Sequence, residues 1–289
     1  MSMVTEWVRA GSTAIVARGD EVSFHPLDGI DGAAFAKRMS GDGTLESTTG
    51  LLDGAISLAF EQTESPPAAV TERPNLLRYI YALTGAYHTA KDTPRNLLWA
   101  AEHFREIGRP EVTEYLEMRA REETGHERLA LKDFRALGLP GERIVANLVP
   151  AGIKPLCDLF ERFSFKDYPI ECVGFSYCSE RIAALKPKEE IDAIQALLPD
   201  SVDATRFLRS HSSLGSEVSH VEETMEFVAS LPAEDRIRVV EATYETALLM
   251  ADGRRLESSK SEAEILHEIE QAAGRALSPG YAARSVAIA

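Results

Sequence analysis

The 289-residue chain has few cysteines and no long apolar run. Its three cysteines, Cys157, Cys172 and Cys178, form no Cys-x-x-Cys pair, which excludes a disulfide framework and a thiolate zinc site. No apolar stretch reaches the roughly 18 residues of a membrane-spanning helix, so we expect no membrane partner. The N-terminal residues contain no basic region followed by an apolar run, so we expect no signal peptide. Together these absences predict a cytoplasmic protein.

Basic residues are also under-represented. The chain has 31 Lys and Arg against 46 Asp and Glu, a formal net charge of −15. Such a charge repels phosphate backbones and anionic lipids, so nucleic acid is not an expected partner. With 44% hydrophobic and 27% charged residues, the chain can build a large core. The length fits one large domain, or one domain with a small appendage.

The N-terminal residues predict a small unit of their own. Two β-prone runs within residues 13–27 flank Gly19-Asp20, a pair typical of a hairpin turn. A short amphipathic stretch over residues 31–38 and a helix from Leu45 to Phe60 follow. The sequence Glu-Ser-Pro-Pro at residues 64–67 then indicates a linker. We therefore expect a β-hairpin-plus-helix unit over residues 1–66.

The rest of the chain, residues 72–289, has a helical pattern and predicts an all-α domain. Gly and Pro residues separate its apolar-periodic segments, as expected at helix ends. No strand-like alternation of comparable quality follows residue 70. The predicted helices are Asn75–Ala90, Pro94–Ile107, Val112–Leu137, Ile153–Phe165, Ile170–Leu185, Lys188–Leu198, Thr205–Leu231, Ala233–Arg254 and Ser261–Leu277.

A Glu-x-x-His motif at Glu123 and His126 is the clearest sign of chemistry in the chain. In the predicted helix Val112–Leu137, both side chains project onto the same face as apolar residues such as Phe134. A buried carboxylate requires a cation, a metal ion or a proton, and Glu and His three residues apart can reach one metal ion. The alternative is structural, because Arg119 projects onto the same arc and could pair with Glu123.

A second carboxylate, Glu180, lies at the edge of an apolar helix face. In the predicted helix Ile170–Leu185, Val173 and Tyr177 belong to that face. The carboxylate could contribute to a site shared with Glu123. It could instead form an ordinary ion pair with Arg181 or Lys186.

Three more candidate ligands fall on the predicted helix Thr205–Leu231. His211 and Glu217 flank its apolar face, and His220 projects farther round. In a straight helix His211 and His220 cannot meet at one site. Residues 212–216, Ser-Ser-Leu-Gly-Ser, weaken a helix, and a kink or bulge there could bring the histidines together. The alternative is that one or both are surface histidines.

The candidate ligands share one chemical character, since all are carboxylates or imidazoles. That donor mixture suits iron or manganese better than zinc with thiolates or magnesium with waters. The candidate metal ligands are Glu123, His126, Glu180, His211, Glu217 and His220.

These segments resemble the haem-oxygenase-like iron-containing redox enzymes, which include diiron oxidases and oxygenases. The resemblance rests on REETGHERLALKDFRALG at residues 121–138, on Glu180, and on HSSLGSEVSHVEETMEF at residues 211–227. It covers about residues 74–255. It implies a haem-oxygenase-like helical bundle and a non-haem iron centre that activates O2. It further implies oxidation of a small amine, amino-acid-like or peptide substrate in a biosynthetic pathway.

The resemblance also implies roles for individual residues. His126 and His211 resemble histidine ligands of the family, and Glu180 resembles its bridging carboxylate. Glu217 and His220 resemble the pair that completes the set. Two positions depart from the family pattern: Gly215 stands four residues after His211, and Arg119 seven residues before His126.

Several functional alternatives stay open. We expect one or two iron ions, O2 as co-substrate, and an external electron donor. Tyr177 and Tyr87 are candidates for proton or electron delivery, or for plain packing. The same fold also hosts metal-free oxidases and thiaminase-like hydrolases that use a cysteine, and a bundle that has lost ligands could be a binding protein or scaffold. The N-terminal element order is similar to that of small peptide-recognition domains, and the sequence leaves monomer and homodimer open.

Overall fold

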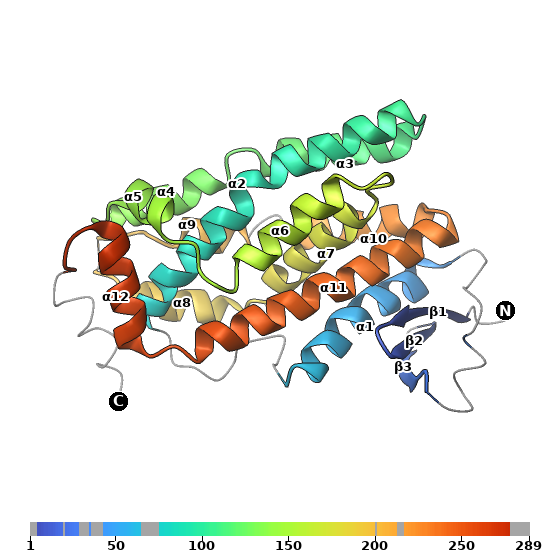
Figure 1. The fold of residues 1–289 in the computed structure, drawn as a ribbon, viewed down its shortest axis with the longest axis horizontal. Helices are drawn as coiled ribbons and strands as arrows, with labels where there is room; N and C mark the ends of the chain where they lie inside the picture. The colour runs from blue at the N-terminus through green and yellow to red at the C-terminus, as the bar shows by residue number, and fades with distance from the viewer. Residues whose placement is uncertain are drawn as a thin grey trace.

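The computed structural model describes residues 5–19, 21–28, 35, 43–64, 75–199, 201–212 and 217–277. Its fold is a helical bundle with a small N-terminal sheet (Figure 1), as predicted. The strands are β1 Thr5–Ala10, β2 Thr13–Arg18 and β3 Glu21–Pro26. The helices are α1 Leu45–Gln62, α2 Leu76–Glu106, α3 Pro110–Glu123, α4 Glu127–Ala136, α5 Gly141–Asn147, α6 Lys154–Ser164, α7 Glu171–Ala184, α8 Lys188–Ala196, α9 Arg206–Ser210, α10 Glu217–Ser230, α11 Ala233–Ser258 and α12 Glu262–Ala273.

The sheet is an antiparallel meander in the order β1-β2-β3. Arg18 pairs with Glu21, so the predicted hairpin turn between β2 and β3 is confirmed. The sequence pattern missed β1, which a second tight turn joins to β2. Gly11 in that turn has φ +58°, a conformation that glycine adopts without strain. The predicted helix over residues 31–38, apart from residue 35, and most of the predicted linker lie outside the described residues.

Helix boundaries differ from prediction at three places. Residues Leu76–Glu106 form one helix, α2, which continues through Pro94 where two helices were predicted. Predicted helix Val112–Leu137 is broken into α3 and α4, because Gly125 has φ +94° and interrupts the helical backbone. Predicted helix Thr205–Leu231 is likewise two helices, α9 and α10. The short helix α5 was not predicted.

The N-terminal unit packs onto the bundle and shares its core. The sheet lies beside α1 at one end of the molecule, and α12 lies at the opposite end (Figure 1). Val8 and Ile15 of the sheet belong to the same buried cluster as Val173 of α7. Buried Glu6 of β1 pairs with buried Arg236 of α11 at 2.5 Å. Sheet and bundle are therefore joined by both apolar and ionic contacts.

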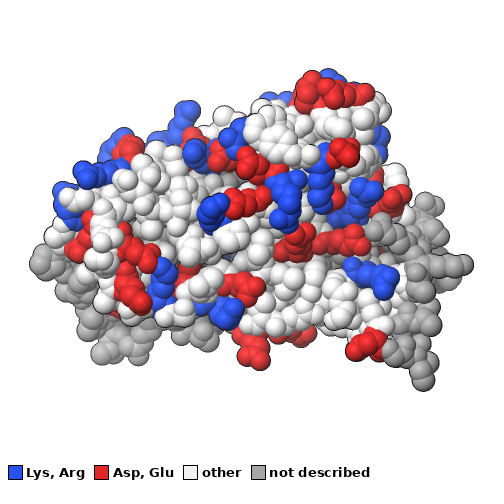
Figure 2. All heavy atoms as spheres, viewed as in Figure 1, with Lys and Arg blue, Asp and Glu red and all other residues white. Residues whose placement is uncertain are grey.

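The surface of the bundle carries both signs of charge. Figure 2 shows acidic side chains interspersed with basic ones across the face in view. Many are ordinary surface pairs, such as Lys154 with Asp158 at 2.7 Å. Within the described residues, none of the helices is both long enough and apolar enough to cross a bilayer.

Candidate metal site and pocket

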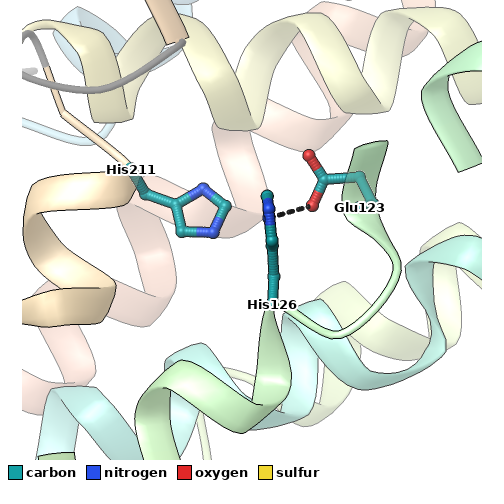
Figure 3. A group of neighbouring side chains, drawn as sticks. All are labelled: Glu123, His126 and His211. Carbon is teal, nitrogen blue, oxygen red and sulfur yellow. Dashed lines mark hydrogen bonds and ion pairs between the residues drawn. The ribbon is translucent and has the colours of Figure 1, made fainter. Parts of the chain in front are cut away.

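Glu123, His126 and His211 meet inside the bundle (Figure 3). One ligand atom from each residue lies within 4.8 Å of the other two. His126 Nδ1 and Glu123 Oε2 are 3.1 Å apart, and the rings of His126 and His211 meet edge to face with centroids 4.7 Å apart. Glu123 is buried and both histidines are half-buried. The group thus presents two imidazoles and one carboxylate to a common point.

Helix ends, rather than a continuous helix, position these three side chains. Glu123 is the last residue of α3, and His126 is the N-cap of α4, on the other side of the break at Gly125. His211 is the C-cap of α9. The two residues of the Glu-x-x-His motif therefore lie close together, but across a turn rather than on one continuous helix.

A buried carboxylate on α4 fixes the position of α9. Asp133 accepts a hydrogen bond from the backbone N–H of Phe207 at 2.9 Å and one from the Arg206 side chain at 3.2 Å. Asp133 is fully buried, and without these hydrogen bonds its buried carboxylate would destabilise the fold. Because His126 is the N-cap of α4 and His211 is the C-cap of α9, this link holds the two histidines close together.

The surroundings of Glu123 favour its charged form. Burial is the largest single effect and opposes ionisation of this carboxyl group, but the hydrogen bond with His126 and the charges around it together outweigh burial. The nearby charges of His211, His126 and Arg119 act in the same direction, so the pKa of Glu123 is lowered below its usual value. An ionised carboxylate is the form that binds a metal ion.

Glu180 and His220 form a second group with the same Glu123. One ligand atom from each of the three lies within 4.8 Å of the other two, and all three are buried. Here a cation is already present, because the guanidinium of Arg119 pairs with Glu180 and, at 2.6 Å, with Glu122. Arg119 itself is 1% exposed. The Glu180 side of the donor set is thus already neutralised by an arginine.

The predicted ion pairs differ from those in the structure. Arg119 pairs with Glu122 and Glu180. The sequence had suggested Glu123 as its partner. Glu180 pairs with Arg119, whereas Arg181 pairs with Asp53 of α1 at 2.7 Å. Glu122 approaches His220 at 3.8 Å, and it was not among the predicted ligands because no sequence pattern distinguishes it from an exposed acidic residue of a helix.

The remaining predicted site residues lie apart or cannot be placed. Glu217 is the first residue of α10, and its side chain lies outside the described residues. Tyr177 is buried and donates a hydrogen bond to Asp53 at 2.7 Å, so it faces α1. Tyr87 packs beside His88, with ring centroids 5.4 Å apart. Neither tyrosine is among the described residues that line the pocket.

A large pocket opens beside the site. It has a volume of about 510 Å³, and Glu123, Glu180 and His211 lie in its wall. Next to them the wall is mainly apolar and includes Phe160, Phe175, Leu208 and Met250. A cavity of this size suits a small molecule, and its apolar walls exclude bulk water from the site.

The geometry of the first group fits a metal ion. Nitrogen and oxygen ligands bind first-row metals at about 2.1 Å, so neighbouring ligands on one face of an ion lie about 3 Å apart. His126 Nδ1 and Glu123 Oε2, which are 3.1 Å apart, already have that separation. A ligand atom of His211 lies within 4.8 Å of one from each of the other two, and it would move closer to complete the set. Two histidines with one carboxylate form the facial set that non-haem iron oxygenases use, which leaves other positions open.

Comparisons with known proteins identify the fold. No family model and no curated protein matches the sequence. The structure is similar to a domain of unknown function with a haem oxygenase-like fold from Shewanella denitrificans OS217, with TM-score 0.55, 19% identity, and coverage of 73% of this chain and 88% of that one. It is also similar to a TenA homolog from Pseudomonas syringae pv. tomato DC3000, with TM-score 0.53, 14% identity, and coverage of 74% and 97%. The chain therefore has a haem oxygenase-like fold, as the sequence predicted.

Proposed function

We propose that the protein is an O2-dependent non-haem iron oxidoreductase that binds ferrous iron at Glu123, His126 and His211. The observation that carries this proposal is the donor set itself, two imidazoles and one ionised carboxylate beside a pocket. Glu123, His126 and His211 would hold ferrous iron, which would supply the activation of O2 beside the pocket. The substrate is a small amine or amino-acid-like molecule, in keeping with a pocket of about 510 Å³.

The arrangement favours one iron rather than two. A second metal ion would need Glu180 and His220, but Arg119 already supplies a positive charge to Glu180. Two cations in one buried site repel each other strongly. We therefore propose a single metal ion, with Arg119 in the place of the second.

The chain's own residues bind the substrate, orient it and exclude water. When bound, the iron supplies O2 activation. In a monooxygenation one oxygen atom enters the substrate and the other leaves as water, with two electrons and two protons from an external donor. The apolar walls at Phe160 and Phe175 keep bulk water away from the reacting atoms.

Metal analysis tests the proposal. Purified protein reconstituted anaerobically with ferrous iron and then desalted should retain about one iron per chain. His126→Ala and His211→Ala should lose it, whereas His267→Ala should not, because His267 is exposed and lies outside the cluster. Retention below about 0.3 iron per chain, or equal iron in His126→Ala, would overturn the proposal.

The same experiment distinguishes two other enzyme classes. A metal-free oxidase would consume O2 after chelation, whereas the proposed enzyme would stop. A cysteine-dependent hydrolase needs a reactive thiol in the pocket, but none of the three cysteines is among its described lining residues. Burial also raises the pKa of the Cys172 and Cys178 thiols well above the usual value, which keeps them protonated.

A further inference from the structure

The outer face of α4 is basic, although the protein as a whole has a formal net charge of −15. The exposed residues of this helix are Arg128, Lys132 and Arg135, and their spacing of four and three residues places them on one side of it. Of the acidic residues of α4, Glu127 is half-buried and Asp133 is fully buried. Figure 2 shows basic side chains gathered over α4 and α5. We call Arg128, Lys132 and Arg135 the basic face.

Neighbouring carboxylates leave the arginines of the basic face available to a partner. Arg128 lies 3.4 Å from Glu127, and Arg135 lies 3.4 Å from Glu142. The two arginine side chains are nevertheless 75% and 76% exposed. Exposed ion pairs of this kind contribute little free energy, so the guanidinium groups can exchange these carboxylates for those of another protein.

The basic face begins beside the metal ligands of the proposed site. His126 is the N-cap of α4, and Arg128 follows it by two residues. Arg128 Cδ is the atom nearest to a Cβ added at Gly125, at 4.0 Å, so the Arg128 side chain lies over the turn between Glu123 and His126. Lys132 is six residues beyond His126, about 9 Å along a helix. The basic face thus extends along α4 from the ligand turn.

The ligands divide between the pocket and another side of the site. Glu123 and His211 line the pocket, whereas His126 is not among its described lining residues. The side chain of His126 is still 18% exposed. That exposure is therefore outside the pocket, at the end of α4 where the basic face begins. A partner on α4 can reach the His126 ring while a substrate occupies the pocket.

We propose that the basic face docks an acidic protein that carries one electron at a time. The need for electrons rests on the proposed function, in which each monooxygenation takes two of them. Two reduced carriers therefore dock in succession, each loses one electron to the site and leaves oxidised, and two protons from solvent enter the water that is formed. The docking itself rests on the charge and position of α4.

Charge complementarity selects an acidic partner and its orientation. Three cations on one helix face attract a negative patch, whereas the net charge of −15 repels the same partner elsewhere. Arg128 and Arg135 are seven residues apart, about 10 Å along the helix, and they protrude into solvent rather than enclose a small anion. A face of this size suits electron-transfer complexes, whose interfaces bury less than about 1,200 Å².

Binding of an acidic plant-type [2Fe–2S] ferredoxin to the metal-free protein tests the docking surface. Surface plasmon resonance at low salt should give a dissociation constant in the micromolar range. Affinity should fall at least about tenfold when NaCl is raised from about 20 to about 300 mM, because salt screens exposed charges. Circular dichroism of each variant described below checks that it is folded.

Charge reversals assign the binding to α4. Arg128→Glu, Lys132→Glu and Arg135→Glu should each weaken ferredoxin binding at least about fivefold, whereas Lys132→Arg should bind like wild type. Lys154→Glu is the matched control, because Lys154 is an exposed residue of α6 and its reversal changes the net charge equally. It should change the affinity less than about twofold.

Electron transfer gives a second measurement. In protein reconstituted with ferric iron, Lys132→Glu should oxidise reduced ferredoxin at least about tenfold more slowly than wild type. The small reductant dithionite should react with both proteins at the same rate, since it needs no docking surface. Equal rates with ferredoxin would overturn the proposal.

The binding results have equally definite outcomes. The proposal is wrong if wild type binds no ferredoxin at about 100 μM in low salt, or if Lys154→Glu weakens binding as much as Lys132→Glu does. A single-stranded oligonucleotide that binds α4 as tightly as ferredoxin would also overturn it. Failure of the proposed function gives another pattern, in which ferredoxin binds the metal-free protein normally but no iron is retained after reconstitution. Iron retention without ferredoxin binding would instead overturn the docking surface alone.

Discussion

Arg119 determines how the interior charges of the bundle are balanced. It is one of the largest fully buried side chains and pairs with both Glu122 and Glu180. Burial opposes its charge, but Glu180 and the other nearby acidic groups raise the pKa of Arg119 above its usual value, so it stays protonated. A permanent cation at this point favours a single metal ion on the other side of Glu123.

Replacement of Arg119 should lower the free energy of unfolding and should change the metal content. Arg119→Met leaves Glu180 buried without its cation, so we expect the free energy of unfolding to fall by about 3–5 kcal/mol. Addition of Co²⁺ should restore part of the loss, since Glu123, Glu180 and His220 become available to a second ion. Urea denaturation with and without Co²⁺, together with titration of bound Co²⁺, measures both effects.

The control for this substitution is Arg121→Met, two residues away on the same helix. Arg121 is exposed, so its loss should change stability by less than about 0.5 kcal/mol. Unchanged stability of Arg119→Met, or a stoichiometry that stays at one Co²⁺ per chain, would contradict the assigned role of Arg119.

Glu257 should make stability depend on pH. Burial raises its pKa from 4.5 to about 7 in the folded protein, so the folded state binds more protons than the unfolded state between these values. Stability is therefore lost as pH rises from about 4.5 to about 7. Glu257→Gln removes this dependence, and we expect it to stabilise the protein at pH 8 by up to about 3 kcal/mol relative to wild type.

The measurement is urea denaturation of both proteins at several pH values. The difference between them should be small at pH 4.5, grow toward pH 7 and then level off. A difference that does not change with pH would show that Glu257 has an ordinary pKa in the folded state.

At the level of the elements, the site depends on breaks between helices. Gly125 separates α3 from α4 with φ +94°, and no described atom lies closer than 4.0 Å to a Cβ added there. A larger residue would therefore meet backbone strain but little crowding. The break turns Glu123 and His126 toward one point beside His211.

Gly125→Ala should lower metal affinity, and this effect can be distinguished from its effect on overall stability. A left-handed conformation costs a residue with a Cβ about 1–2 kcal/mol, so stability should fall by that amount and metal affinity should fall at least about tenfold. Gly108→Ala is the matched control, because Gly108 has φ +74° and open space around it but lies away from the cluster. It should lose similar stability and keep its metal affinity. Equal metal affinity in the two variants would contradict the role of the Gly125 turn.

The sequence predicted which side chains lie close together, but not the helix breaks that bring them together. Periodicity located most helices, and the hairpin turn at Gly19-Asp20, because both follow from local patterns. It could not show that Gly125 would leave the helix, since an isolated glycine costs a helix only about 1 kcal/mol and tertiary contacts decide the outcome. The weak segment after His211 was identified as a place for a kink, and the chain does end a helix there.

Long-range pairing explains most of what the sequence did not predict. The choice of Arg119 for Glu180, rather than Arg181 or Lys186, depends on the tertiary structure that brings these two residues together, and no local pattern encodes it. The polar residues of the pocket wall were missed for the same reason. Lys186 follows α7 and Arg254 belongs to α11, and only the fold places them in one wall.

At the scale of the whole molecule, the N-terminal unit and the bundle form one packed body. A division at residues 66–72 would cut through a continuous apolar cluster that includes Ile15, Leu52 and Val240. Glu6 adds a buried ionic link, because it accepts hydrogen bonds from Arg236 of α11 and from Ser47 of α1. Separation of the two parts would leave these charges and apolar faces in water, so we expect them to unfold together.

Unfolding followed by two probes tests this cooperativity. In a Trp99→Phe background, Trp7 of β1 is the only tryptophan of the chain and reports the sheet, whereas far-ultraviolet circular dichroism reports the helices. The two guanidinium transitions should coincide. Glu6→Gln should move both midpoints down together, with a loss of about 3 kcal/mol, because Arg236 is left buried without its charged partner. The exposed control Glu234→Gln should move neither. A sheet transition that precedes the helical one would instead show that the N-terminal unit is an independent domain.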